Sequence, residues 1–287
     1  MTGDDIFYTS SDGLDLHARS YGSGDEGAAV VCLHGLTRNH KDFEPMMEAL
    51  DMPARYISID IRGRGQSAHD PDPTNYNPGR YAADVLHLLD ELKLERVHLI
   101  GTSMGGIISM ILMTMIPERI AGIVLNDVGP RVEQAGLQRI IRSAAPVTGF
   151  ESWSAAAEAI AQAQAVPYPH LSSEDWMAFA RRSCRQLDDG QVVADFDPAI
   201  ITGASDTKPG LMARLGMWRL FAKMKSAPLL VIRGEYSDIL SEKTAKTMVK
   251  RHKRASLATI PGVGHAPLLN EPYAVEVIRT FLNETAA

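Results

Sequence analysis

Short apolar runs, most of them followed by an amphipathic stretch, recur along the chain. Runs of β-branched and aliphatic residues that alternate with helical patterns are typical of a parallel sheet covered by helices on both faces. The expected strands are Ala29–Leu33, Tyr56–Ile61, Val97–Ile100, Ile120–Asn126, Leu229–Ile232 and Leu257–Ile260. The expected helices are Lys41–Leu50, Arg80–Leu92, Met104–Ile116, Glu242–Arg251 and Pro272–Asn283. The pattern therefore predicts an α/β fold.

The sheet is expected to begin with an antiparallel hairpin. Two further strand-like runs, Phe7–Thr9 and Leu14–Ser20, flank the tripeptide Ser11-Asp12-Gly13. An Asp-Gly pair between two such runs is a strong hairpin signal, because both residues tolerate the backbone angles of a tight turn.

The alternation of strands and helices stops after Asn126 and resumes at Pro228. Between them, helical patterns dominate, and Ser172 followed by acidic residues is a typical helix start. We predict that residues 131–223 form a mostly helical cap over the carboxyl ends of the strands. Residues 1–130 and 224–287 then form the core.

The bulk composition narrows the classes of function and partner. A chain of 287 residues buries roughly three quarters of its unfolded surface. Its net charge of −6 argues against a general affinity for nucleic acid or anionic membranes. The longest nearly uncharged apolar segment, Met104–Ile116, has 13 residues and is too short to span a bilayer. The acidic start of the chain lacks the apolar stretch of a signal peptide, so a cytoplasmic location is expected.

No cofactor is expected from the motifs. The chain contains no HExxH motif, no P-loop and no metal-spaced set of cysteines and histidines. Cys32 and Cys184 are expected to be buried, unpaired thiols. A small molecule is the expected partner, and the sequence leaves open whether the chain forms a homo-oligomer.

The segment Gly101-Thr-Ser103-Met-Gly105 lies between an expected strand and an expected helix. It matches G-x-S-x-G, in which a tight turn exposes a nucleophilic serine at the carboxyl edge of the sheet. Small residues also let a helix pack closely on a sheet, which is the alternative explanation for Gly105 and Gly106.

A serine hydroxyl is a weak nucleophile and needs an adjacent base. His265 follows the last strand through a glycine-rich turn that can present its ring at the sheet edge. A carboxylate must then orient the imidazole. We favour Asp238, after the strand Leu229–Ile232; Asp127 at the end of the preceding strand and Glu235 are the alternatives.

Several motifs in this order resemble those of capped members of the α/β-hydrolase superfamily, over nearly the whole chain. They are His34-Gly35, Asp60-Ile-Arg-Gly-Arg-Gly-Gln-Ser67, Gly101-Thr-Ser-Met-Gly-Gly106, Gly234-Glu-Tyr-Ser-Asp238 and Gly264-His265. The resemblance implies an α/β-hydrolase fold, with Ser103 as nucleophile, His265 as base and Asp238 as acid. The order of these three residues agrees with that family.

The oxyanion formed during catalysis needs backbone hydrogen-bond donors. The amide of Met104 starts a helix directly after Ser103, and the second donor is expected after the first parallel strand, where Leu36 is the candidate. The resemblance implies that these two amides form the oxyanion hole.

The nucleophile and its surroundings restrict the reaction. Haloalkane dehalogenases and epoxide hydrolases of this fold attack with an aspartate where this chain has Ser103. Carbon–carbon bond hydrolases often carry Trp after the Gly-His pair, where this chain has Ala266. We therefore predict a serine hydrolase of a small carboxylic ester or lactone that forms an acyl-enzyme. A carbon–carbon hydrolase of vinylogous diketo acids, and a ligand-binding receptor with a vestigial triad, are the alternatives.

The cap is expected to determine substrate specificity. Trp153, Trp176 and Trp218 are candidates for an apolar pocket, and Arg38 for recognition of a substrate carboxylate. The alternatives are that the tryptophans form the cap's own core and that Arg38 is solvated at the surface.

Overall fold

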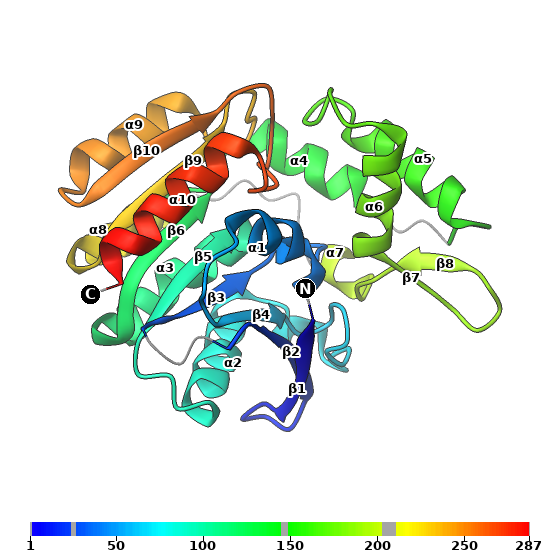
Figure 1. Ribbon diagram of the computed structural model, residues 1–287, viewed down its shortest axis with the longest axis horizontal. Helices are drawn as coiled ribbons and strands as arrows, with labels where there is room; N and C mark the ends of the chain where they lie inside the picture. Colours follow the sequence, from blue (N-terminus) through cyan, green and yellow to red (C-terminus); the bar gives the residue numbers. More distant parts are fainter. Residues whose placement is uncertain (1, 24–26, 145–148, 203–210, 287) are drawn as a thin grey trace.

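The computed structural model describes residues 2–23, 27–144, 149–202 and 211–286, and its centre is a mixed eight-stranded sheet (Figure 1). The strand order is β1-β2-β4-β3-β5-β6-β9-β10. The first two strands pair antiparallel with each other, β2 pairs antiparallel with β4, and the remaining pairs are parallel. The strand bounds are β1 Gly3–Thr9, β2 Asp15–Tyr21, β3 Ala29–Leu33, β4 Tyr56–Asp60, β5 Val97–Thr102, β6 Ile120–Asn126, β9 Leu229–Gly234 and β10 Ala255–Ile260. The predicted fold class, including its antiparallel start, is confirmed.

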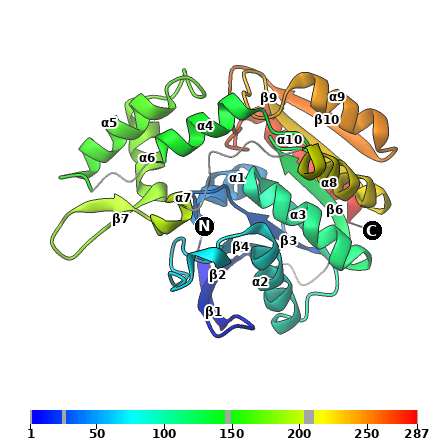
Figure 2. The same cartoon turned by 180° about the vertical axis from the view of Figure 1, so that it is seen from behind.

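Helices cover both faces of the sheet. One face carries α2 (Pro78–Glu91), α3 (Met104–Met115), α8 (Leu211–Ala222) and α9 (Glu242–Arg251), as Figure 2 shows for α2, α3 and α8. The other face carries α1 (Glu44–Leu50) and α10 (Pro272–Thr285). Alternate residues of each central strand serve the two cores: in β3, Val31 and Leu33 face the first set and Val30 and Cys32 the second. This two-sided burial is the reason that the strands have near-continuous apolar sequences.

The segment between β6 and α8 forms a separate lobe beside the carboxyl ends of the strands (Figure 1). Its helices are α4 (Gln134–Ser143), α5 (Trp153–Gln164), α6 (Ser173–Ser183) and α7 (Ala199–Thr202). It has its own apolar core, in which Tyr168, Trp176 and Phe179 pack together. Ser172 caps α6 in a reciprocal capping box with Asp175, as the helix-start signal indicated.

Two features of this region add to the prediction of a mostly helical cap over residues 131–223. A short hairpin of β7 (Cys184–Gln186) and β8 (Val192–Ala194) follows α6. In addition, Trp218 and Phe221 of α8 pack against the main core rather than against the core of the cap. The carboxyl end of the predicted cap segment is therefore part of the helical layer on the sheet.

Short 3₁₀ helices complete the described elements: η1 His40–Phe43, η2 Pro73–Asn75, η3 Pro117–Arg119 and η4 Lys223–Ser226. Cys32 and Cys184 are both buried and unpaired, as predicted. Within the described ranges, no helix has the length and apolar character needed to cross a membrane.

Candidate active site

Ser103 lies in a sharp turn between β5 and α3. Its backbone has φ 51° and ψ −111°, a conformation that non-glycine residues rarely adopt and that the surrounding packing must maintain. That packing depends on the neighbouring glycines. A Cβ on Gly105 would overlap the carbonyl of Leu33 in β3, and one on Gly101 would lie 2.5 Å from the backbone of Gly105. The glycines therefore let α3 approach the sheet, and this close approach holds the half-buried Ser103 in its sharp turn.

His265 connects Ser103 to a carboxylate. Its Nε2 lies 3.1 Å from Ser103 Oγ, and its Nδ1 lies 2.7 Å from Asp127 Oδ2. The cap segment fixes the loop that carries His265: the amide of Gly264 donates to Pro167 O at 2.7 Å, and Tyr168 Oη donates to Ala266 O at 2.6 Å. The residues on both sides of His265, Gly264 and Ala266, are thus hydrogen-bonded to the cap, which fixes the position of His265.

The carboxylate against His265 belongs to Asp127, so the prediction that Asp238 occupies this place is wrong. Asp127 follows β6 and is fully buried. Besides His265, its carboxylate accepts hydrogen bonds from the Gly234 amide at 3.0 Å and from Ser237 Oγ at 2.6 Å. Strand β6 lies directly beside β5, which precedes Ser103, so its end delivers a side chain close to the serine.

Asp238 instead pairs with the cap. Arg139 of α4 donates from Nε and Nη2 to the two oxygens of Asp238 at 2.7 and 2.8 Å. Partial burial disfavours the charged form of Asp238, but the bidentate guanidinium outweighs it and holds the pKa of this carboxyl below its usual value. No hydrogen bond joins Asp238 to His265. Glu235, the other alternative, accepts from the Gly262 amide at 2.8 Å and does not contact His265.

The turn after β3 is fixed by a buried histidine. His34 accepts a hydrogen bond at Nε2 from the Ile61 amide at 3.1 Å, so its proton is on Nδ1, which donates to Gly35 O at 2.7 Å. Burial lowers the pKa of His34 to about 4, which keeps the ring neutral. Because a peptide unit is planar, holding the carbonyl of Gly35 also fixes the direction of the Leu36 amide.

Leu36 and Met104 both border the space next to Ser103. The Met104 amide is the first of helix α3, where backbone N–H groups have no intrahelical acceptor and attract negative charge. The two residues predicted to form the oxyanion hole therefore line the same cavity as Ser103.

Two cavities meet at Ser103. The first, of about 150 Å³, has a mixed lining in which apolar residues such as Phe179 and Leu268 lie beside Thr37, Arg38, Gln164 and His265. Because it is the more polar of the two, we call it the polar cavity. The second, of about 300 Å³, is lined mainly by aliphatic side chains and is not bordered by His265. Its apolar lining includes Met104, Ile107, Val128, Val132, Leu137, Ile140, Ile141, Ile200 and Ile239.

Of the four predicted substrate-binding residues, Arg38 alone borders these cavities. Its Nε donates to both oxygens of Asp42 at 2.8 and 2.9 Å, and its guanidinium lies 4.0 Å from the ring centre of Phe179. An arginine already paired in this way is part of the wall of the polar cavity.

None of the three tryptophans that were candidates for the apolar pocket lines either cavity. Trp176 is buried in the cap core, Trp153 lies under the guanidinium of Arg181, and Trp218 packs against Phe221 of the main core. Helix α4 of the cap contributes Leu137, Ile140 and Ile141 to the apolar lining instead. Their i, i+3, i+4 spacing is the sequence signal that could have identified them.

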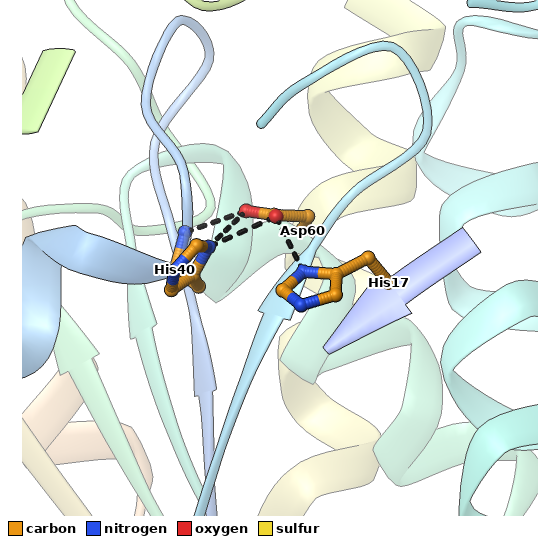
Figure 3. Close-up of side chains that lie close together, drawn as sticks. All are labelled: His17, His40 and Asp60. Carbon is orange, nitrogen blue, oxygen red and sulfur yellow. Dashed lines mark hydrogen bonds and ion pairs between the residues drawn. The ribbon is translucent and has the colours of Figure 1, made fainter. Parts of the chain in front are cut away.

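A second group of titratable side chains lies near the end of β4. His17, His40 and Asp60 are buried and close together, and Figure 3 shows both rings directed at the carboxylate. Asp60 accepts from His17 Nδ1 at 2.7 Å and His40 Nδ1 at 2.9 Å, and from the amides of His40 and Gln66 at 2.7 and 3.0 Å. These four donors occupy the lone pairs of the carboxylate, so the group is a hydrogen-bonded ionic cluster rather than an open metal site.

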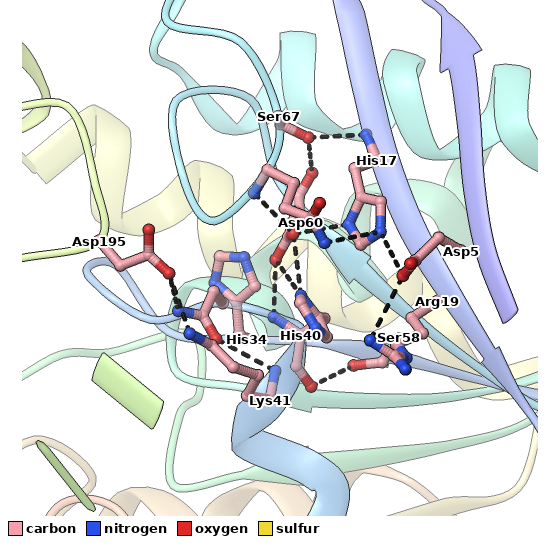
Figure 4. Close-up of polar contacts among 12 residues, drawn as sticks. Asp5, His17, Arg19, His34, His40, Lys41, Ser58, Asp60, Ser67 and Asp195 are labelled. Carbon is pink, nitrogen blue, oxygen red and sulfur yellow. Dashed lines mark hydrogen bonds and ion pairs between the residues drawn. The ribbon is translucent and has the colours of Figure 1, made fainter. Parts of the chain in front are cut away.

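This cluster anchors the turn that begins at Asp60. Figure 4 shows the network extending to Asp5, whose Oδ1 lies 3.0 Å from His17 Nε2, and to Ser67, which donates to the Asp60 carbonyl at 2.6 Å. Burial opposes ionisation of Asp60, but the hydrogen bonds from the two histidines hold its pKa well below the usual value.

Sequence comparison with known proteins identifies the family to which the chain belongs. A family model described as the alpha/beta hydrolase fold matches residues 28–272. The chain belongs to the α/β-hydrolase superfamily. This α/β-hydrolase is 30% identical to a 3-hydroxybutyrate-oligomer hydrolase of Cupriavidus necator, over 93% of each chain. It is 26% identical to an esterase of Mycobacterium tuberculosis, over 91% of this chain and 84% of the relative.

A solved structure gives the same result. The crystal structure of an alpha/beta hydrolase from Novosphingobium aromaticivorans has a TM-score of 0.90 and 39% sequence identity, and the match covers 98% of both chains. The family match and the hydrolases among its relatives show that the α/β-hydrolase is an enzyme with hydrolase activity. The predicted family resemblance is confirmed.

Proposed function

We propose that this α/β-hydrolase is a serine esterase that cleaves small carboxylic esters through an acyl-enzyme. The observation that supports this most is the position of His265, which lies within hydrogen-bond distance of both Ser103 Oγ (3.1 Å) and Asp127 Oδ2 (2.7 Å). A nucleophile, a base and a group that orients the base are the three parts that acyl transfer by serine requires.

In the first step, His265 Nε2 accepts the proton of Ser103 as Oγ attacks the ester carbonyl. Asp127 holds the Nδ1–H and stabilises the imidazolium that forms. The hydrogen bonds from Gly234 and Ser237 fix the carboxylate of Asp127 in the orientation that this role needs. The amides of Leu36 and Met104 bind the oxyanion.

The direction of proton transfer when the tetrahedral intermediate collapses indicates which cavity holds the alcohol and which holds the acyl group. The imidazolium of His265 donates its proton to the leaving alcohol oxygen, so the alcohol lies on the side that His265 borders, which is the polar cavity. The acyl group then occupies the aliphatic cavity. A water molecule, deprotonated by His265, attacks the acyl-enzyme and releases the acid.

The division between an apolar and a polar cavity suits a short aliphatic acyl group joined to a polar alcohol. The 3-hydroxybutyrate-oligomer hydrolase is named for a substrate of this kind, since each of its internal esters joins a short acyl group to a hydroxy acid. We therefore extend the proposal to short oligomers of aliphatic hydroxy acids. Lactones undergo the same chemistry and belong in the same substrate panel.

The proposal is tested with p-nitrophenyl butyrate, the 3-hydroxybutyrate dimer and trimer, a set of lactones and a vinylogous diketo acid. Wild-type enzyme is expected to hydrolyse the esters, and Ser103→Ala to lose about 10⁴-fold or more in kcat. A fluorophosphonate probe should label wild type and not the variant. Undiminished turnover by Ser103→Ala would overturn the proposal.

Two other outcomes would support the other hypotheses. Cleavage of the diketo acid alone would assign the α/β-hydrolase to carbon–carbon hydrolysis. Stoichiometric binding of an ester without turnover or labelling would indicate a receptor with a vestigial triad.

A further inference from the structure

Arg64 is a fully buried cation, and within the described ranges no carboxylate oxygen lies at ion-pair distance from it. Arg62, two residues earlier in the same turn, shows the usual alternative: it pairs with Asp12, Asp70 and Asp84. An unneutralised buried charge is unfavourable for folding, and burial holds the pKa of Arg64 below its usual value. Because a buried arginine without a carboxylate partner destabilises the fold, we expect a functional role of Arg64 among the residues that it contacts.

The guanidinium of Arg64 touches both residues of the proposed oxyanion hole. Its Nε donates to Leu36 O at 2.9 Å, and its Nη2 lies 3.6 Å from Met104 Sδ. Its Nη1 donates to Arg62 O at 2.7 Å and to Tyr81 Oη at 3.0 Å, which fixes the plane of the guanidinium.

These contacts complete the restraint of Leu36. The peptide before Leu36 is held by His34 through the carbonyl of Gly35, and the peptide after it is held by Arg64 through the carbonyl of Leu36. With both flanking peptides fixed, the backbone of Leu36 has little freedom to turn its amide away from the nucleophile. Pre-aimed donors of this kind are effective because they need no reorganisation when negative charge develops.

The cap holds the turn that carries Arg64. The Gly65 amide donates to Asp195 O at 3.0 Å, and the Asp197 amide donates to Gly63 O at 2.7 Å, so residues on both sides of Arg64 are hydrogen-bonded to the segment after β8. The position of the guanidinium is therefore determined by core and cap together.

We propose that Arg64 is the positioning residue of the oxyanion hole: it holds the backbone of Leu36 in place and contacts the side chain of Met104, and its charge favours the negative charge that develops at the hole. This inference rests on the proposed esterase function. In a site of low effective dielectric, a fixed cation beside the hole stabilises the tetrahedral oxyanion more than the neutral ester. Loss of Arg64 should accordingly lower kcat and leave KM nearly unchanged.

The variants are Arg64→Met, which removes charge and donors, and Arg64→Lys, which keeps the charge but not the planar fork. Removal of one oxyanion donor costs about 10²–10³ in rate; for donors that are loosened rather than removed, we expect a loss of about 10- to 100-fold in kcat. Arg64→Lys should recover part of this loss.

Arg119→Met is the matched control. Arg119 also binds a backbone carbonyl, with Nε and Nη2 at 3.2 and 2.8 Å from Leu94 O, but it lies before β6, at the opposite edge of the sheet from Ser103. Its kcat should equal that of wild type.

A trifluoromethyl ketone separates positioning from a general structural effect. Ser103 Oγ gives its proton to His265 Nε2 and adds to the ketone carbon, the carbonyl electrons move to oxygen, and the resulting oxyanion occupies the hole. In Arg64→Met, affinity for this ketone should fall by the same factor as kcat/KM, while affinity for the corresponding amide, which forms no adduct, should not change. The pKa of the hemiketal hydroxyl, followed by ¹³C NMR, should rise.

Thermal unfolding by circular dichroism identifies the folded variants, and Arg64→Lys serves if Arg64→Met does not fold. Wild-type kcat in a folded Arg64 variant, or equal losses for the ketone and the amide, would refute the positioning role. Turnover that survives in Ser103→Ala would refute the esterase function itself, whatever the Arg64 variants show.

Discussion

The choice between Asp127 and Asp238 as the acid of the triad can be decided with two isosteric substitutions. In Asp127→Asn, the side chain can present its NH₂ group to His265 Nδ1. The imidazole proton then resides on Nε2, which can no longer accept the proton of Ser103. Replacement of the triad acid by Asn lowers kcat by about 10⁴-fold in the best-studied serine protease, which corresponds to about 5.4 kcal/mol. Because Asp127 is fully buried and has the same hydrogen bond to the base, we expect a loss of that order.

Asp238→Asn is the matched comparison. Its carboxylate is 37% exposed and its partner Arg139 is 21% exposed, so solvent screens the pair. Pairs of this kind contribute about 0.5 kcal/mol to stability. The variant should therefore retain kcat within about threefold of wild type.

The assay is hydrolysis of p-nitrophenyl butyrate, with kcat and KM determined for each variant and folding checked by urea denaturation. The opposite ranking, with Asp127→Asn near wild type and Asp238→Asn about 10⁴-fold slower, would refute the reasoning and restore Asp238 as the acid.

Three further predictions concern specificity, pH and packing. Ile107→Trp should fill the aliphatic cavity. Each methylene of the acyl chain that is buried there contributes about 0.8 kcal/mol, or about fourfold in kcat/KM, so a series of esters with longer acyl chains should show this gain in wild type and not in the variant. Burial opposes charge on His17, but Asp60 and Asp5 raise its pKa, whereas the pKa of Asp60 is lowered. The contribution of Asp60 to stability should thus be lost as pH falls below about 4, and that of His17 should be lost as pH rises above about 6.5. The midpoints of urea denaturation measured across pH should show both losses, and the loss above pH of about 6.5 should be absent in His17→Gln. Gly105→Ala should destabilise the protein by about 1–3 kcal/mol or more, because its Cβ would overlap the backbone of Leu33. Gly216→Ala, where a Cβ on α8 meets open space, should stabilise it by about 0.5–1 kcal/mol. Urea denaturation that found Gly105→Ala more stable than Gly216→Ala would contradict the packing argument.

The sheet and its flanking helices could be predicted because their sequence pattern is set by burial on both faces. Strand β3, for example, is apolar at every position since alternate residues enter different cores. The hairpin of β7 and β8 was missed because each strand is only three residues long, and in β7 two of them are exposed. Helix α8 was assigned to the cap because its pattern indicates a helix but contains no information about the surface on which it packs.

The site was predictable where a motif fixes local geometry and less so where distant segments meet. Ser103 and His265 each follow a strand through a turn of small residues, and both lie where the sequence placed them. The three tryptophans do not line the cavities, and their sequence could not show this because a large aromatic side chain suits an apolar core as well as a pocket. Recognition of the α4 aliphatic residues requires knowing which face of that helix covers Ser103.

The error about the acid has a more specific cause, which also shows how the site is built. The sequence motif placed the acid at the end of β9 and in the loop that follows. This segment does not supply the carboxylate that faces His265; Gly234 and Ser237 instead donate hydrogen bonds to Asp127, which follows the adjacent strand β6. With that carboxylate in place against His265, Asp238 is free to pair with Arg139 of α4. The end of β9 and the loop after it thereby support the proposed triad through Gly234 and Ser237 and hold the cap through Asp238. Exchange of the acid between neighbouring strand ends leaves the direction of the imidazole unchanged, because the base requires a carboxylate at Nδ1 and not a particular strand to supply it.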